Sequence, residues 1–185
     1  MLTTMLRGLG IIAVLVIVVI VMYNRLVDLK NARENAFADI DVQLTNRFDL
    51  VENLVNTVKG YASHEKETLQ GLTEARTNFL HANGVEGKLE ASNQLTGALK
   101  SLFAVSENYP DLKANENFLH LQNELSDLEN KLAAARRFFN ATTKEYNTAL
   151  QTFPSNMIAK SFGFTPATFF ELENQAAKQV PKVSF

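Results

Sequence analysis

The sequence predicts an all-α protein, in which an N-terminal transmembrane helix continues into an elongated antiparallel bundle of about four helices. An uncharged apolar run occupies residues 8–24 and is flanked by Arg7 and Arg25. Downstream, apolar residues recur every three or four positions, which places them along one face of an α-helix. Proline and glycine, the residues that most often interrupt helices, are absent from residues 11–59. These observations favour long helices that pack side by side.

The apolar run has the composition of a membrane anchor. Nine of the eleven residues from Ile11 to Val21 are Ile or Val, which in water would suit a buried strand. In a bilayer, an isolated segment satisfies its own backbone hydrogen bonds only as a helix. Residues 8–24 rise about 26 Å as a helix, against a hydrocarbon core of about 30 Å, and Tyr23 suits the interface. We therefore expect a single-pass anchor, preceded by a short segment over residues 1–7.

A cleaved signal peptide also begins with a basic residue and an apolar run. Here the positions just after the run hold large residues, and the first Ala-x-Ala, at 36–38, lies inside a helical pattern. We therefore expect the anchor to be retained. Arg25, Lys30 and Arg33 follow the run, whereas Arg7 alone precedes it. By the positive-inside rule, this bias predicts that the domain is cytoplasmic.

The first helix of the bundle is predicted to continue directly from the anchor. Its apolar stripe extends from Leu26 to Ala62 at helical spacing and is interrupted only by Arg33. Gly60 is the first residue suited to end it. The anchor and the first bundle helix are therefore expected to be one continuous helix.

Two shorter helices are predicted next. Apolar residues at helical spacing occupy 69–79 and 89–103, each with the periodicity of an amphipathic helix. Between them, residues 81–87 contain two glycines and an Asn-Gly pair, which predicts a loop. The third helix should end near Asn108, because the residue before Pro110 is disfavoured in helical conformation.

The fourth helix has the most regular pattern. Over 118–153, an apolar residue occupies ten of eleven positions in a series of alternating three- and four-residue steps, the heptad spacing of a packed seam. Asn115 or Asn117 can cap its start, and Pro154 ends it. Because the first and fourth helices carry matching stripes, we expect them to pair antiparallel in a bundle over residues 25–153.

A phenylalanine-rich C-terminal segment, residues 154–185, follows the bundle and holds five of the thirteen phenylalanines. Two interpretations stay open: the segment folds back and closes the end or groove of the bundle, or it contacts a partner or the membrane. Its candidate interaction residues are Phe162, Phe164, Phe169 and Phe170.

Three polar residues on the first helix complete the candidate interaction surface: Asp41, Arg47 and Asp49. Charged residues along a helix commonly form a solvated face. The alternative is hydrogen bonding between helices or between subunits, with Arg136 and Arg137 as guanidinium donors to the two aspartates.

No catalytic, metal or cofactor site is predicted. The absence of cysteine excludes thiolate catalysis and zinc–thiolate sites, and no Gly-x-Ser-x-Gly motif or phosphate-binding glycine loop occurs. His120 has Glu116 and Glu124 four residues away, but a di-iron bundle needs two Glu-x-x-His pairs. The net charge of −2, with no basic run longer than Arg136-Arg137, argues against a nucleic-acid partner.

Several short motifs follow one another along nearly the whole chain. They are Tyr23–Val27, Asp41–Leu44, Arg47–Val51, Val58–Ala62, Ser106–Ala114, Phe118–Leu125, Ala135–Arg137, Tyr146-Asn147, Phe153–Asn156 and Phe162–Phe164. In composition and order they resemble the LemA family. This resemblance implies a bacterial single-pass membrane protein with a long helical bundle and no established active residue.

Together, these features predict a non-enzymatic, membrane-anchored helical scaffold or assembly protein of the bacterial inner membrane. Its expected partners are membrane lipid, copies of itself and an unidentified membrane protein. An alternative function is that of an adaptor that regulates a membrane enzyme such as a protease.

Overall fold

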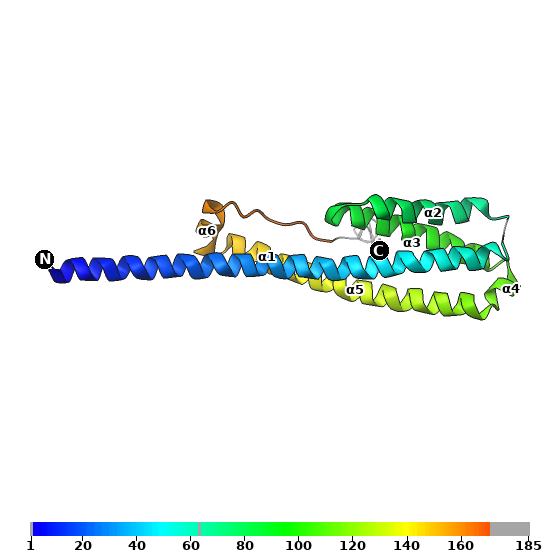
Figure 1. The fold of residues 1–185 in the computed structure, drawn as a ribbon, viewed down its shortest axis with the longest axis horizontal. Helices are drawn as coiled ribbons and strands as arrows, with labels where there is room; N and C mark the ends of the chain where they lie inside the picture. The colour runs from blue at the N-terminus through cyan, green and yellow to red at the C-terminus, as the bar shows by residue number, and fades with distance from the viewer. Residues whose placement is uncertain (1, 63, 171–185) are drawn as a thin grey trace, which may run out of the picture. The chain divides into compact units, whose positions relative to one another are not determined.

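The computed structural model describes residues 2–62 and 64–170, and within them the chain is helical, without strands (Figure 1). The helices are α1 (Leu2–Lys59), α2 (Lys66–His81), α3 (Gly84–Ser106), α4 (Pro110–Lys113), α5 (Glu116–Gln151) and α6 (Ser155–Ser161). The predicted all-α class and the packed helical bundle are confirmed. Helices α4 and α6 are additional short helices that the sequence pattern did not predict.

Helix α1 contains the apolar run. Within the described part of the chain, it is the one helix long and apolar enough to cross a bilayer, with a mean hydropathy of 2.6 over its most apolar window and none of that window buried. The helix continues without a break to Lys59, as predicted. An apolar helix surface left uncovered by the rest of the chain matches a lipid environment better than water.

The described residues form two compact units. Unit 1 comprises residues 2–42 and 132–169, and unit 2 comprises residues 43–131 and Phe170. Helices α1 and α5 contribute residues to both units. The predicted division into a bundle over 25–153 and a separate C-terminal segment stays a prediction.

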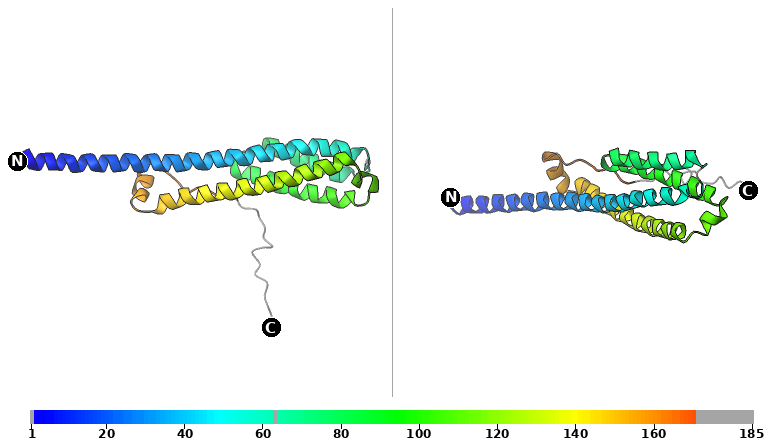
Figure 2. Two further views of the ribbon diagram at one scale, coloured as in Figure 1. Left: turned by 90° about the horizontal axis from the view of Figure 1, so that it is seen from below. Right: turned by 45° about the vertical axis from the view of Figure 1, so that its right-hand side comes forward.

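In unit 1, the C-terminal part of α5 runs antiparallel to α1, and α6 turns back beside them (Figures 1 and 2). Leu26 of α1 is buried together with Tyr146 and Leu150 of α5 and Ala159 of α6. Further along the pair, the ring centroids of Phe37 and Phe139 are 5.7 Å apart. A close antiparallel pair of apolar stripes, as the sequence predicts, thus forms this core.

In unit 2, the end of α1 packs with α2, α3, α4 and the first part of α5. Phe48 of α1 stacks on Phe79 of α2, with ring centroids 4.0 Å apart, and Phe103 of α3 meets Phe118 of α5 edge-on. Aromatic contacts in unit 2 thus join α1 to α2 and α3 to α5.

The predicted loop over 81–87 was wrong in length. Helix α2 ends at His81 and α3 begins at Gly84, so only two residues separate them. Gly84 has a φ of +71°, a conformation that glycine adopts without the steric cost of a side chain. The reversal is complete at Gly84, so Gly87 lies inside α3, where a Cβ would be 3.6 Å from Ala82.

Candidate functional site

The most distinctive surface of unit 1 lies at the end of the apolar run of α1. We call residues 152–164, which include α6, the α6 turn. The ring of Tyr23 lies 4.9 Å from that of Phe162 and 5.8 Å from that of Phe164, measured between centroids. Because Tyr23 marks the expected interface of the anchor, these contacts place the α6 turn at the same level.

Local hydrogen bonds explain why the chain reverses here. The Ser155 hydroxyl is 2.6 Å from the carbonyl oxygen of Ala149, a carbonyl that the end of α5 leaves without a helical partner. The same hydroxyl is 2.8 Å from the Thr152 carbonyl oxygen, which also accepts from the Asn156 N–H. At the other end of α6, Gly163 has a φ of +74°. The Phe164 N–H then donates to the carbonyl oxygen of Ala159 at 2.9 Å, a closure typical of a glycine-terminated helix.

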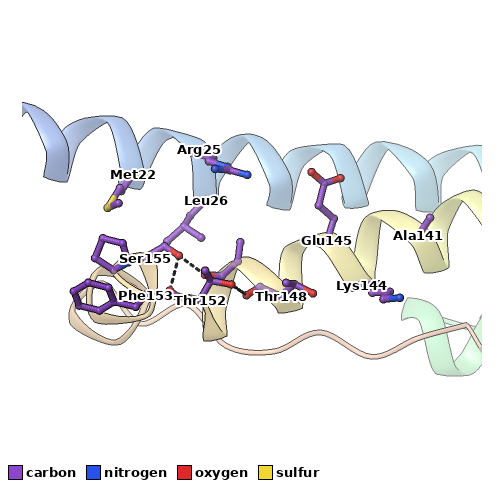
Figure 3. A pocket seen from close by; sticks show the side chains of 12 residues that line it. Met22, Arg25, Leu26, Ala141, Lys144, Glu145, Thr148, Thr152, Phe153 and Ser155 are labelled. Carbon is purple, nitrogen blue, oxygen red and sulfur yellow. Dashed lines mark hydrogen bonds between the residues drawn. The ribbon is translucent and has the colours of Figure 1, made fainter.

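Between α1, α5 and the α6 turn lies a pocket of about 530 Å³ (Figure 3). Met22 and Leu26 line it from α1, and Phe153 from the α6 turn. Charged residues from α1 and α5 also line it, among them Arg25 and Glu145. The pocket therefore joins an apolar wall to charged groups, a combination that suits an amphiphilic ligand.

Three large apolar side chains of the α6 turn lie outside the core of unit 1 and are largely exposed. The exposed fractions are 75% for Phe153, 60% for Met157 and 56% for Phe162. Phe153 was counted in the predicted seam of the fourth helix, and that assignment was wrong. Helix α5 ends at Gln151, so the helical spacing no longer directs Phe153 toward α1.

After the α6 turn, residues 164–168 run back along α5 as an extended segment that we call the strap (Figure 1). The side-chain amide of Asn147 donates to the Ala167 carbonyl oxygen and accepts from the Ala167 N–H, both at 2.8 Å. The Tyr146 hydroxyl donates to the Thr165 carbonyl oxygen at 3.1 Å. The fold-back interpretation of the C-terminal segment therefore holds for the strap.

Arg33, the residue that interrupted the apolar stripe of α1, also holds the strap. Its guanidinium donates to the Thr168 carbonyl oxygen at 3.2 Å and lies over the Phe139 ring, 4.8 Å from the centroid. Burial raises the pKa of the nearby Tyr146, and the positive charge of Arg33 partly offsets that rise. The strap is thus held by side chains of both long helices.

Of the three polar residues predicted on α1, Arg47 lies inside unit 2 and not on its surface. It is 5% exposed; its Nη2 lies 2.9 Å from Glu129 Oε2 of α5, and both terminal nitrogens lie 3.3 Å from the Thr96 hydroxyl of α3. Burial lowers the pKa of Arg47, and the carboxylate of Glu129 opposes that shift. Arg47 therefore fits the alternative of hydrogen bonding between helices.

The other predicted interaction residues are not gathered on one surface. Asp41 is half-buried in unit 1, and Asp49 is exposed in unit 2. Asp49 lines a shallow groove of about 430 Å³ together with Glu124, Asp127 and Lys131. The pairing of the two aspartates with Arg136 or Arg137 stays a prediction.

The four phenylalanines also differ. Phe162 and Phe169 are exposed, Phe164 is half-buried against the core of unit 1, and Phe170 is 2% exposed. Phe170 thus belongs to the interior. The sequence reasoning missed Phe153 and Met157 as exposed apolar residues, although the proline after Phe153 was a signal that the seam ends there.

The described part of the chain contains no group of three His, Cys, Asp or Glu side chains placed to hold a metal ion. Its distinctive groups are the uncovered apolar helix, the α6 turn and the strap. These features define a membrane-associated helical bundle protein.

The chain belongs to the LemA family, whose model matches residues 36–185. It is 26% identical over 149 residues to Protein LemA of Metamycoplasma hominis, across 80% of this chain and 68% of that protein. It is 23% identical to Magnetosome protein MamQ 2 of Paramagnetospirillum magneticum and 24% identical to Magnetosome protein MamQ of Magnetospirillum gryphiswaldense. Each of these two matches covers 80% of this chain and 64% of the relative, so the chain spans about two thirds of the length of these relatives.

Proposed function

We propose that this protein is a non-enzymatic scaffold that holds copies of itself, and through them other proteins, at the bacterial inner membrane. The observation that carries the proposal is the continuity of α1, which extends from the apolar run into helices packed in both units. Because helix joins the packed residues of unit 1 to the anchor, with no flexible linker between them, the surfaces of unit 1 keep a fixed orientation to the anchor. Such an orientation suits the assembly of identical copies.

Confinement to a membrane supports assembly energetically. Identical surfaces held in one plane meet at a higher effective concentration than free copies in solution do. The apolar run itself lacks a pair of small residues four positions apart, since Val14 follows Gly10 at that spacing. Close helix–helix packing in the bilayer therefore has no small-residue motif to use. Copies instead associate through the bundle, with Asp49 and Phe169 as exposed candidate contact residues.

Native mass spectrometry of the full-length chain in nanodiscs tests the proposal. We expect multiples of the 20.6 kDa chain, and we expect Asp49→Arg to reduce them by placing a cation on the assembly surface. Glu67→Arg, an exposed charge reversal on α2, is the matched control and should leave the multiples unchanged. A monomer, under conditions that preserve other weak membrane complexes, would contradict assembly.

The acidic groove beside Asp49 favours a second candidate function, that of an adaptor regulating a membrane enzyme such as a protease. Three of its lining side chains are carboxylates, Asp49, Glu124 and Asp127, and they suit a basic segment of a partner. A photo-crosslinking residue at position 50, which also lines the groove, distinguishes the two functions in native membranes. Crosslinks between copies support the scaffold, and crosslinks to a membrane protease support the adaptor.

A further inference from the structure

The α6 turn exposes large apolar side chains that belong to none of the cores described above. Phe153, Met157 and Phe162 lie within ten residues of one another and all are more than half exposed. Exposed apolar residues are unremarkable when scattered singly, but a contiguous group marks a site of interaction. We propose that the α6 turn inserts into the headgroup region of the bilayer that holds the anchor and binds anionic lipid there.

Continuity with the membrane span identifies lipid as the occupant. Tyr23 lies at the end of the apolar run, and its ring contacts Phe162 and Phe164. One turn further along α1, Leu26 packs against Ala159 of α6. If residues 8–24 cross the hydrocarbon, these contacts hold the α6 turn at the interface, where aromatic side chains are favoured.

The charges around the α6 turn specify the kind of lipid. Three exposed cationic side chains lie in the α6 turn or beside it: Lys160 on α6, Arg25 on α1 and Lys144 on α5. Two exposed carboxylates, Asp28 of α1 and Glu145 of α5, lie on the same stretches of the long helices. Lys30, further along α1, is paired with Glu34 at 3.8 Å, so the excess beside the turn is one positive charge. Cations close to a bilayer surface attract anionic headgroups, and this attraction falls off within about one Debye length.

The short length of α6 does not prevent this contact. A helix of seven residues buries too little apolar area to hold a protein on a membrane by itself. Here the anchor already keeps the turn beside the bilayer, so its insertion is an intramolecular step at high effective concentration. The α6 turn therefore acts as a second, weaker membrane contact of the same protein.

Depth measurement on the full-length chain in nanodiscs tests this inference. The sequence contains no cysteine, so Met157→Cys carries a single nitroxide label, and Phe153→Cys provides a second position. We expect both labels in nanodiscs of phosphatidylcholine and phosphatidylglycerol to be more accessible to oxygen than to a water-soluble nickel chelate. Leu80→Cys, an exposed position on α2 in unit 2, is the control and should show the accessibility of a label in water.

Charge reversal tests the role of anionic lipid. Lys144→Glu combined with Lys160→Glu should move the Met157→Cys label toward water. The ratio of oxygen accessibility to nickel accessibility at this label should fall at least threefold. Lys100→Glu combined with Lys131→Glu, two exposed lysines of unit 2, should leave that ratio unchanged. The same ratio in pure phosphatidylcholine and in mixed lipid would overturn the assignment to anionic headgroups.

Two other results would overturn insertion itself. Labels at 153 and 157 that are as accessible to nickel as the Leu80→Cys label would place the α6 turn in water. Labels shielded from both reagents, with spin–spin broadening that grows with the number of chains per nanodisc, would show that a second copy covers the turn. Neither result would contradict the scaffold proposal, which native mass spectrometry tests separately.

Discussion

Arg47 carries a charge in a place where water cannot solvate it. Its guanidinium has two described partners, the carboxylate of Glu129 and the hydroxyl of Thr96. Burial lowers the pKa of Arg47 and the carboxylate of Glu129 opposes that shift, while the arginine stays charged at neutral pH. The partners of this ion pair are unequal, because the Glu129 side chain is 44% exposed whereas that of Arg47 is 6% exposed.

Because Arg47 is buried and Glu129 is partly exposed, removing Glu129 should cost more unfolding free energy than removing Arg47. Glu129→Ala leaves a buried guanidinium without its counter-charge and should lower the free energy of unfolding by about 2 kcal/mol. Arg47→Met removes the buried charge and fills similar space, while Glu129 regains water, so its cost should be below about 1 kcal/mol. Denaturant unfolding of the full-length chain in mild detergent, followed by circular dichroism, measures both. Asp127→Ala, an exposed acidic change on the same helix, is the control, and a larger loss for Arg47→Met than for Glu129→Ala would refute the argument.

Tyr109 predicts a pH dependence. Its hydroxyl donates to Glu65 Oε1 at 2.9 Å, and this hydrogen bond, followed by burial and the charge of Glu65, raises the pKa of Tyr109 above its ordinary value of 10.0. The folded state therefore holds the proton more tightly than the unfolded state does. The resulting stabilisation is present below about pH 10 and is lost as pH rises through the folded pKa.

The test compares Tyr109→Phe with the parent chain at pH 8 and pH 11. The variant should melt at a lower temperature at pH 8, because it lacks the hydrogen bond, and should lose less between the two pH values. Thermal unfolding by circular dichroism measures this difference, and the titration of lysines is common to both proteins. Equal losses in the two proteins would show that the Tyr109–Glu65 hydrogen bond does not form.

At the residue scale, the sequence indicated which residues could interact but not which residues surround them in the fold. Arg47 was assigned to an interaction surface because polar residues flank the helix seam, but its partners come from residues 49 and 82 positions away in the chain. Local spacing contains no information about such partners. For the same reason, the exposure of Phe162 and the burial of Phe170 were not separable from the sequence.

At the scale of elements, α5 and the strap depend on each other in unit 1. Helix α5 supplies Tyr146 and Asn147, one from its buried stripe and one beside it, and both bind the backbone of the strap. Phe164 and Ala167 of the strap in turn pack against the apolar cluster that contains Tyr146. An extended segment without its own secondary structure is thereby held in a defined register.

The seam of α5 is tested by placing a carboxylate in it. Leu132 is fully buried, so Leu132→Asp buries an unpaired charge and should cost several kcal/mol of unfolding free energy. Leu119→Asp changes an exposed leucine of the same helix and should cost about 0.5 kcal/mol or less. Thermal unfolding compares the two variants. An unchanged melting curve for Leu132→Asp would show that the seam faces solvent.

The register of the strap is tested by Asn147→Ala, which removes both hydrogen bonds to Ala167. At about 1 kcal/mol for each bond, we expect the Ala167 amide to exchange its hydrogen at least tenfold faster. Asn123→Ala, at an exposed position of α5, should leave that rate unchanged. Hydrogen–deuterium exchange of the full-length chain measures both. Unaltered protection at Ala167 would mean that packing alone holds the strap.

Long elements were predicted well because their signal is local and repeated. The stripes that begin at Leu26 and Phe118 define α1 and α5 over many turns, and one irregular residue such as Arg33 does not hide them. The start of α3 and the whole of α6 were missed for a different reason. Each depends on one or two residues, Gly84 in a left-handed conformation and Ser155 at the end of α5, whose hydrogen bonds and backbone angles the apolar pattern does not record.

At the scale of the whole molecule, the side of the membrane on which the bundle lies stays a prediction. The Lys and Arg bias around the apolar run predicts that the bundle lies in the cytoplasm. Because the sequence contains no cysteine, Leu80→Cys in unit 2 and Leu6→Cys before the apolar run each provide one label site. In intact spheroplasts, a membrane-impermeant maleimide should label Leu6→Cys and should label Leu80→Cys only after lysis. The reverse pattern would place the bundle outside.

Because α1 is unbroken past Tyr23 and Arg25, the orientation of the span in the bilayer also sets the orientation of the α1 residues that follow it. With no hinge at the lipid–water boundary, any tilt of the span is the same tilt for the residues of α1 that follow it in unit 1. A change in membrane thickness or curvature that rotates the span therefore rotates the bundle surface attached to it, without any soluble ligand. The tilt of the span and the tilt of the α1 residues that follow it in unit 1 are therefore one and the same quantity.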